Sequence, residues 1–270
     1  QVARRSLKVM AGTFVLTVSL ILCMIFVPKK NALDTLQKRE AKAKETGKMT
    51  EEQLAKQKAN GSESEDTICT TDLTDDEILE GLNLLLIGDS IAVDVTDDFY
   101  EMFPNSVSDT KIGRITSLGK QVLDSYIDEK KWEGEGVIFA SLSNSPINGE
   151  LEAIREKIGK DMPLFLTTVR IPHDTFEEES NSKIKKFVEE NDHTYLIDWY
   201  AASEGHDEYF DADDTHLLSA GAKAYAKCIK EAVLDAYKKE NIEIPKSRLV
   251  SSTDTSTDSS NDSSTNAITE

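Results

Sequence analysis

The sequence predicts an α/β fold in three layers, α/β/α, with a five-stranded parallel sheet between two layers of helices. Between residues 82 and 240, five apolar runs alternate with five stretches of helical periodicity. The apolar runs are nearly continuous, which is typical of parallel strands buried on both faces. The predicted strands are 82–87, 107–112, 137–142, 164–169 and 195–198. The predicted helices are 91–103, 117–131, 150–159, 176–191 and 219–240.

An uncharged apolar run at residues 9–27 lies upstream of this region. A helix rises about 1.5 Å per residue, so a run of about 19 residues spans a hydrocarbon core of about 30 Å. The basic residues before it (Arg4, Arg5 and Lys8) would also suit a signal peptide, but no small-residue cleavage site follows. We therefore expect a retained transmembrane helix within residues 1–30, at the cell membrane, with the rest of the chain extracytoplasmic.

Residues 31–60 are rich in Lys, Glu, Gln and Ala and contain few apolar residues, and residues 60–67 are typical of a flexible joint before the domain. Residues 31–73 are therefore predicted to be a charged, solvated stalk or linker that is dispensable for chemistry. Its helix is expected to be interrupted at Gly47 and restarted by a capping box of Thr50 with Gln53.

The folded domain is predicted to cover residues 74–240. A second capping box, Thr74 with Glu77, is expected to begin its first short helix. Residues 241–270 are rich in Ser, Thr and Asp and have almost nothing to bury, so they predict a disordered tail.

The composition argues against several classes of function. The formal net charge is −19 and no basic stripe is present, so no nucleic-acid partner is expected. The four histidines are dispersed without ligand spacing, so neither a metal site nor a cofactor is predicted. The three cysteines form no framework, although Cys69 and Cys228 could pair outside the cell or remain free.

The most specific stretch is LLLIGDSIAVDV at residues 84–95, where a buried strand ends in Gly88-Asp89-Ser90. One interpretation is structural, because Asp and Ser are ordinary residues at a helix N-cap. The other is that Ser90 is a nucleophile, since ligands of parallel sheets bind at the carboxyl ends of the strands. Ala92 departs from the G-x-S-x-G elbow of α/β-hydrolases, so the hydroxyl needs partners found elsewhere in the chain.

Partners for Ser90 are predicted at the same edge of the sheet. Asp213 precedes His216 by three residues, so it can hold one ring nitrogen within a turn and leave the other facing a serine. Asp214 is the alternative orienting acid. Gly113 follows the second strand and Asn144 the third, and both are candidate oxyanion-hole donors, although either alone could be a plain turn residue.

These four blocks resemble the SGNH hydrolase superfamily, named for its Ser, Gly, Asn and His. Residues 195–226, with DTKIGR at 109–114 and VRIP at 169–172, are similar to the extracytoplasmic domain of bacterial peptidoglycan O-acetyltransferases. The resemblance covers about residues 82–237. It implies an SGNH hydrolase-like fold and places this chain at the C-terminal end of a longer membrane acyltransferase.

The resemblance also implies a role for each site residue. Ser90 would be the nucleophile, His216 the general base and Asp213 its orienting acid. The backbone N–H groups of Ser90 and Gly113 and the side chain of Asn144 would form the oxyanion hole. The upstream membrane acyltransferase domain would supply the acetyl group, and Ser90 would pass it to a hydroxyl of a cell-wall glycan, most often N-acetylmuramic acid of peptidoglycan.

One departure from the family concerns the loop after the third strand. Where the family reads Gly-Thr-Asn-Gly, this chain reads Leu142-Ser143-Asn144-Ser145, so we expect an altered pocket. Two alternative functions stay open. The chain could be a membrane-anchored carbohydrate acetylesterase, or a catalytically weakened module that binds the wall.

Overall fold

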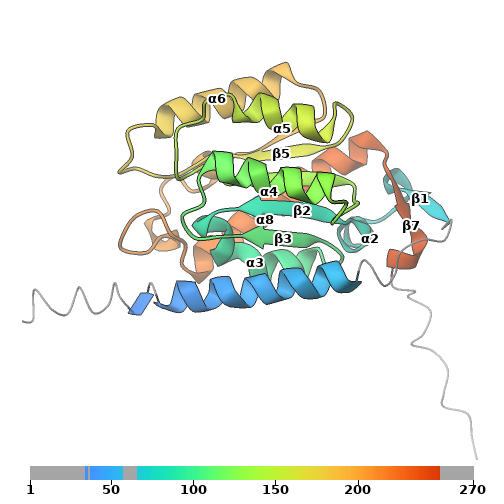
Figure 1. Ribbon diagram of the computed structural model, residues 1–270, viewed down its shortest axis with the longest axis horizontal. Coiled ribbons are helices and arrows are strands. Elements are labelled where there is room, and N and C mark those ends of the chain that lie inside the picture. The colour runs from blue at the N-terminus through green and yellow to red at the C-terminus, as the bar shows by residue number, and fades with distance from the viewer. Residues whose placement is uncertain (1–33, 36, 57–65, 250–270) are drawn as a thin grey trace, which may run out of the picture.

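The computed structural model describes residues 34–35, 37–56 and 66–249 (Figure 1). At its centre lies a five-stranded sheet in the order β3-β2-β4-β5-β6, in which every neighbouring pair is parallel. The predicted α/β class and parallel sheet are therefore confirmed, with each predicted strand end correct to within about two residues. The strands are β2 (Leu84–Gly88), β3 (Val107–Thr110), β4 (Gly136–Ala140), β5 (Leu164–Thr167) and β6 (Thr194–Ile197).

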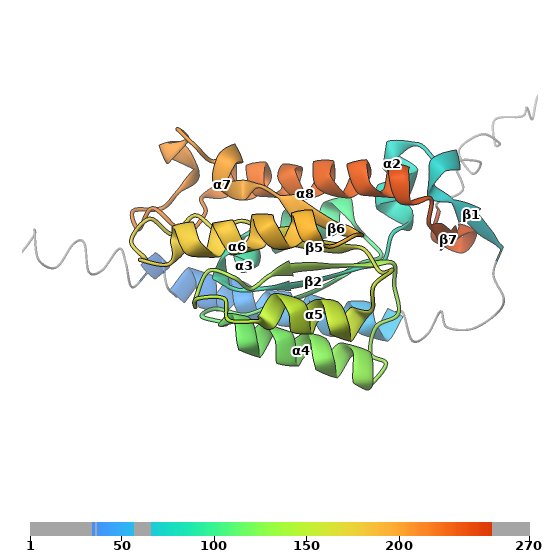
Figure 2. The same ribbon diagram turned by 90° about the horizontal axis from the view of Figure 1, so that it is seen from above.

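Helices cover both faces of the sheet (Figures 1 and 2). One face packs against α2 (Asp75–Gly81), α3 (Ser90–Met102) and α8 (Ser219–Glu240). The other packs against α4 (Thr116–Asp128), α5 (Glu150–Ile158) and α6 (Glu177–Glu190). Successive strand residues point to opposite faces, so Leu84 and Leu86 enter the first core while Leu85 and Ile87 enter the second. Because both sides of β2 are buried, its sequence carries no polar side chain.

The short elements were not predicted, because runs of three or four residues carry no periodic signal. The helical ones are α7 (Trp199–Ala202) and three 3-10 turns, η1 (Thr70–Asp72), η2 (Asp207–Tyr209) and η3 (Lys246–Arg248). The remaining two, β1 (Thr67–Cys69) and β7 (Glu243–Pro245), form a small antiparallel sheet. Both strands lie outside the limits of 74 and 240 that the sequence suggested for the folded domain.

The predicted capping box at the start of α2 is present. The Thr74 Oγ accepts a hydrogen bond from the Glu77 backbone N–H at 3.4 Å. In return, the Glu77 carboxylate accepts from the Thr74 backbone N–H at 2.8 Å. The two bonds satisfy donors that the first turn of a helix leaves without an intrahelical acceptor.

The segment predicted as a solvated stalk forms a helix that lies against the domain beside α3 (Figure 1). This helix, at residues 37–56, continues through Gly47, so the predicted break and the capping box of Thr50 with Gln53 are wrong. The Thr50 hydroxyl instead lies 2.9 Å from the Thr46 carbonyl oxygen and 2.5 Å from that of Ser108 on β3. Contacts of this kind outweigh the cost of about 1 kcal/mol that a helical glycine carries.

The predicted transmembrane helix at residues 9–27 and most of the predicted tail lie outside the described residues. Within the part of the chain that the structure describes, no helix is both long and apolar enough to cross a membrane. Cys69 and Cys228 are both half-buried and both free, so the alternative in which they pair is not realised here.

Candidate active site

Ser90 is the first residue of α3, directly after the strand β2 and the single residue Asp89. Gly88 makes this tight connection possible, because a Cβ at that position would lie 2.1 Å from the Ala92 Cβ. The Asp89 side chain caps α3 by accepting a hydrogen bond from the Ile91 backbone N–H at 3.0 Å. The structural interpretation of the motif therefore holds for Asp89, while the Ser90 hydroxyl remains available for another partner.

That partner is His216. Its Nε2 lies 3.0 Å from the Ser90 Oγ, and its Nδ1 lies 2.7 Å from the Asp213 Oδ2. The other oxygen of Asp213 accepts the backbone N–H of His216 at 2.9 Å, which closes the turn that the spacing predicted. The structure thus joins the three predicted residues in one hydrogen-bonded chain from carboxylate to imidazole to hydroxyl.

The environment of Asp213 keeps its carboxyl ionised. Partial burial favours the neutral acid, but the hydrogen bonds from the His216 backbone and ring outweigh this effect. The pKa of Asp213 therefore lies below its ordinary value. A carboxylate in this position holds the imidazole in the tautomer whose Nε2 can accept a proton from Ser90.

Asp214, the alternative orienting acid, points elsewhere. It adopts a left-handed backbone conformation with φ of 54°, and its side chain lies 3.2 Å from the His173 Nε2 at the surface. The geometry therefore distinguishes the two adjacent acids, and Asp213 is the one on the His216 ring.

The two other predicted donors lie on loops at the carboxyl edge of the sheet. Gly113 lies in an exposed turn after β3 with φ of +69°, and its N–H has no hydrogen-bond acceptor among the described residues. Asn144 lies exposed after β4, and its amide donates to the Ser143 Oγ at 3.3 Å. Neither is hydrogen-bonded to Ser90. Among the described residues the Gly113 N–H is unoccupied, whereas the Asn144 amide already contacts Ser143.

The two residues that replace the family's glycines each have a structural contact. Leu142 is fully buried in the core beneath α4 and α5. The Ser145 Oγ lies 3.2 Å from both the backbone nitrogen and the hydroxyl of Thr116 at the start of α4. Between them, Ser143 donates its N–H and its hydroxyl to the Asp89 carboxylate. Side-chain contacts therefore fix the loop that carries Asn144.

Arg114 is a site residue that sequence reasoning missed, although it ends the DTKIGR motif. Its buried guanidinium donates to the Gly88 carbonyl oxygen at 3.0 Å, directly before Asp89 and Ser90. It also donates to the Asp109 backbone oxygen and carboxylate at 2.6 and 2.5 Å. The Tyr126 hydroxyl donates to the same carboxylate at 3.0 Å. Arg114 thus ties the β3 end to the turn that presents Ser90.

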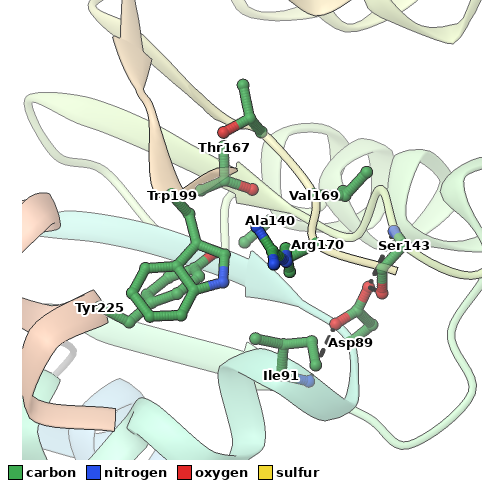
Figure 3. Close-up of a pocket in the computed structure, with 10 residues that line it drawn as sticks. Asp89, Ile91, Ala140, Ser143, Thr167, Val169, Arg170, Trp199 and Tyr225 are labelled. Atoms are coloured by element: carbon green, nitrogen blue, oxygen red, sulfur yellow. Dashed lines mark hydrogen bonds between the residues drawn. The ribbon is translucent and has the colours of Figure 1, made fainter. Parts of the chain in front are cut away.

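A small pocket opens beside Ser90 between the ends of β2, β4, β5 and β6 (Figure 3). Asp89 and Ile91, the neighbours of Ser90, form one wall, and Trp199 and Tyr225 form another. Arg170 also lines the pocket, with its guanidinium 5.5 Å from the centre of the Tyr200 ring. The pocket has room for little more than a water molecule, and its accessible lining is mainly apolar.

Two further features describe the chemistry open to this site. Full burial raises the pKa of Asp89 above its ordinary value, even though Ser143 and Ile91 donate hydrogen bonds to it. In the described part of the chain, no group of three or more His, Cys, Asp or Glu side chains could hold a metal ion.

Because Leu142 is buried, Leu142→Gly should lower the free energy of unfolding by about 3 kcal/mol or more, from a lost core side chain and a more flexible backbone. Chemical denaturation of the parent and the variant measures this. Ser145→Gly is the matched control in the same loop, and it should cost about 1 kcal/mol for its lost hydrogen bonds. A Leu142→Gly variant as stable as the parent would show that this side chain does not anchor the loop.

Several curated proteins resemble this chain, whereas no protein-family model matches it. The O-acetyltransferase OatA of Staphylococcus aureus (strain NCTC 8325 / PS 47) is 34% identical over 146 residues. These residues make up 54% of this chain and 24% of that protein. Another S. aureus protein (strain COL), whose name places it among the O-acetyltransferases, is 30% identical over 165 residues, or 61% of this chain and 26% of its own length. The chain therefore spans about a quarter of the relatives it matches.

A solved structure has the same fold. The C-terminal catalytic domain of Streptococcus pneumoniae peptidoglycan O-acetyltransferase A (OatA), determined with a methylsulfonyl adduct, superposes with a TM-score of 0.54 at 21% identity. The match covers 62% of this chain and 99% of that domain. The chain is thus homologous to staphylococcal OatA and has the SGNH/GDSL fold of the S. pneumoniae OatA catalytic domain.

Proposed function

We propose that this chain is a serine-dependent O-acetyltransferase that moves an acetyl group, through an acetyl-serine on Ser90, to a hydroxyl of a cell-wall glycan. The observation that carries the proposal is the hydrogen-bonded chain from Asp213 through His216 to Ser90. The homology to staphylococcal OatA supports acetyl transfer as the reaction.

In the first step, the Ser90 Oγ attacks the carbonyl carbon of the acetyl donor while His216 Nε2 takes the hydroxyl proton. The Asp213 carboxylate stabilises the imidazolium that forms. The tetrahedral intermediate then collapses, the His216 proton passes to the leaving oxygen of the donor, and an acetyl ester remains on Ser90.

The negative charge of that intermediate needs hydrogen-bond donors. We assign three: the backbone N–H groups of Ser90 and Gly113 and the side-chain amide of Asn144. Ser90 is the first residue of α3, so its N–H has no acceptor within the helix. The dipole of α3 adds a partial positive charge at the same place.

In the second step, His216 takes the proton of an acceptor hydroxyl, and the acceptor oxygen attacks the acetyl-serine. Ser90 leaves with the proton returned by His216, and the glycan carries the acetyl group. We propose N-acetylmuramic acid of peptidoglycan as the acceptor, consistent with the homology to OatA.

The proposal also covers the membrane anchor of the domain and the source of its acetyl donor. The apolar run at residues 9–27 would anchor the chain in the cell membrane, with the catalytic domain on the outside. An upstream membrane acyltransferase domain would supply the acetyl donor. The relatives are about four times longer than the matched region, which leaves room for such a domain in them.

The same groups would serve a carbohydrate acetylesterase, since water can replace the sugar hydroxyl in the second step. A purely wall-binding module is disfavoured, because binding alone would not require an imidazole held between a carboxylate and a serine. Acetyl transfer to chitooligosaccharide, measured beside release of free acetate from the same small acetyl ester, separates the two enzymes. Acetate release that no sugar acceptor diminishes would favour the esterase.

We expect Ser90→Ala to abolish turnover of a small acetyl ester, because no hydroxyl then remains to carry the acetyl group. Labelling by a serine-directed fluorophosphonate should disappear as well. The control is Ser143→Ala, which removes a nearby hydroxyl and should keep the label. Normal labelling of Ser90→Ala would place the nucleophile elsewhere.

Asp213→Asn should lower kcat by about 10⁴-fold, because an amide favours the wrong His216 tautomer. Asp214→Asn is the matched control at the adjacent position, and it should change kcat less than about twofold, since the Asp214 side chain lies on His173 and not on the His216 ring. Steady-state hydrolysis of the small ester measures both. The opposite ranking would assign the orienting role to Asp214.

Asn144→Ala should lower turnover of the small ester by about 10²–10³-fold, the usual cost of one oxyanion-hole donor. Asn148→Ala, a change of an exposed asparagine in the same loop, is the control and should be near neutral. The two variants are compared by kcat for ester hydrolysis and by acetyl transfer to chitooligosaccharide. Unchanged rates in Asn144→Ala would show that this residue only shapes the turn and is not an oxyanion-hole donor.

A further inference from the structure

The Arg39 guanidinium lies near three carboxylates, two of them on the loop that carries His216. Its Nη2 donates to the Asp211 Oδ2 at 3.1 Å. Its Nε lies 3.8 Å from the Asp94 Oδ1, and its Nη1 lies 3.9 Å from the Asp213 Oδ2. That oxygen of Asp213 is the one that faces the His216 Nδ1. The Arg39 side chain is only 14% exposed, so water screens these interactions less than at an open surface.

The three carboxylates belong to the two elements that must meet for catalysis. Asp94 lies on α3, one turn after Ser90. Asp211 and Asp213 lie on the loop that carries His216. One planar guanidinium with several donors can hold both elements at the same time, which a single point charge does less well.

The backbone of the loop transmits this contact to the imidazole. The Asp211 N–H donates to the His216 carbonyl oxygen at 2.8 Å, and the Leu217 N–H donates to the Asp94 Oδ2 at 3.1 Å. A shift of Asp211 or Asp94 would therefore move the residue whose Nε2 lies 3.0 Å from the Ser90 Oγ.

Arg39 comes from the 37–56 helix, outside the predicted limits of the catalytic domain. We propose that Arg39 is a positioning residue. It ties the His216 loop to α3 and so keeps the His216 Nε2 within hydrogen-bonding distance of the Ser90 Oγ. The inference rests on the proposed function of these two residues. It replaces the expectation that residues 31–73 are dispensable for chemistry, because a segment upstream of the domain completes the support of the triad.

The test compares Arg39→Met with Lys42→Met in the full chain, purified in detergent. Lys42 is the matched control, because it lies on the same helix and contacts Asp94 and Asp97 of α3 but not the His216 loop. Both variants lose one cation and one contact between the helix and α3. We expect Arg39→Met to lower kcat for a small acetyl ester by about 10–100-fold with little change in KM, because only alignment is lost. Lys42→Met should keep kcat within about twofold of the parent.

A double-mutant cycle assigns the effect to the proposed contact. Asp211→Asn removes the closest partner of Arg39 and should lower kcat to a similar extent. Combined with Arg39→Met, it should add little more, since both changes break one interaction. Arg39→Lys should recover part of kcat, because it restores the charge without the planar fork.

Each outcome bears on a separate claim. Equal kcat in the parent, Arg39→Met and Asp211→Asn, with the parent losing activity on Ser90→Ala, would overturn the positioning role alone. Fully additive losses in the cycle would also overturn it. A parent without Ser90-dependent turnover would instead contradict the proposed function. Should Arg39→Met fail to fold, Asp211→Asn and Arg39→Lys still decide the matter.

Discussion

The hydrogen bond between Ser90 and His216 is the contact on which the site depends, and it joins residues 126 positions apart. No local structure can form it, so the fold has to bring both ends together. Ser90 is fixed by the short turn between β2 and α3, while His216 lies just before α8. The helices α3 and α8 pack on the same face of the sheet. The Leu217 N–H, just before α8, donates to Asp94, one turn into α3, so the two helices begin side by side. Figure 2 shows α8 running along this side of the sheet.

Helix packing alone does not fix the distance of 3.0 Å between the Ser90 Oγ and the His216 Nε2. Specific polar contacts restrict the remaining movement of the two helices. Asp94 on α3 accepts the backbone N–H of Leu217, the residue after His216, and the Leu217 side chain is buried in the same core. Burial raises the pKa of Asp94 above its ordinary value, while the nearby Arg39 opposes the shift. The buried carboxylate is therefore costly unless cations and donors surround it, which links the 37–56 helix to the integrity of the site.

The sequence was sufficient for features that repeat or that lie within one turn. Strands buried on both faces leave continuous apolar runs, and an acid three residues before a histidine can contact its ring in a single turn, as Asp213 does. The sequence was insufficient where contacts between distant residues determine the local structure. Gly47 looked like a helix break because propensity ignores the packing around Thr50. Arg114 was assigned no role of its own within DTKIGR, because only the fold shows its buried acceptors.

Asp89 connects Ser90, the proposed nucleophile, to the loop that carries Asn144. One oxygen of this buried carboxylate caps α3 beside Ser90, and the other accepts the N–H and the hydroxyl of Ser143. An oxyanion hole requires donors held at a fixed distance from the developing charge. In this chain the shared carboxylate, with Leu142 buried and Ser145 bonded to α4, sets the position of the Asn144 loop relative to Ser90. The absence of both glycines is thus compatible with a preorganised site, because anchoring contacts take over what a close backbone approach would otherwise provide.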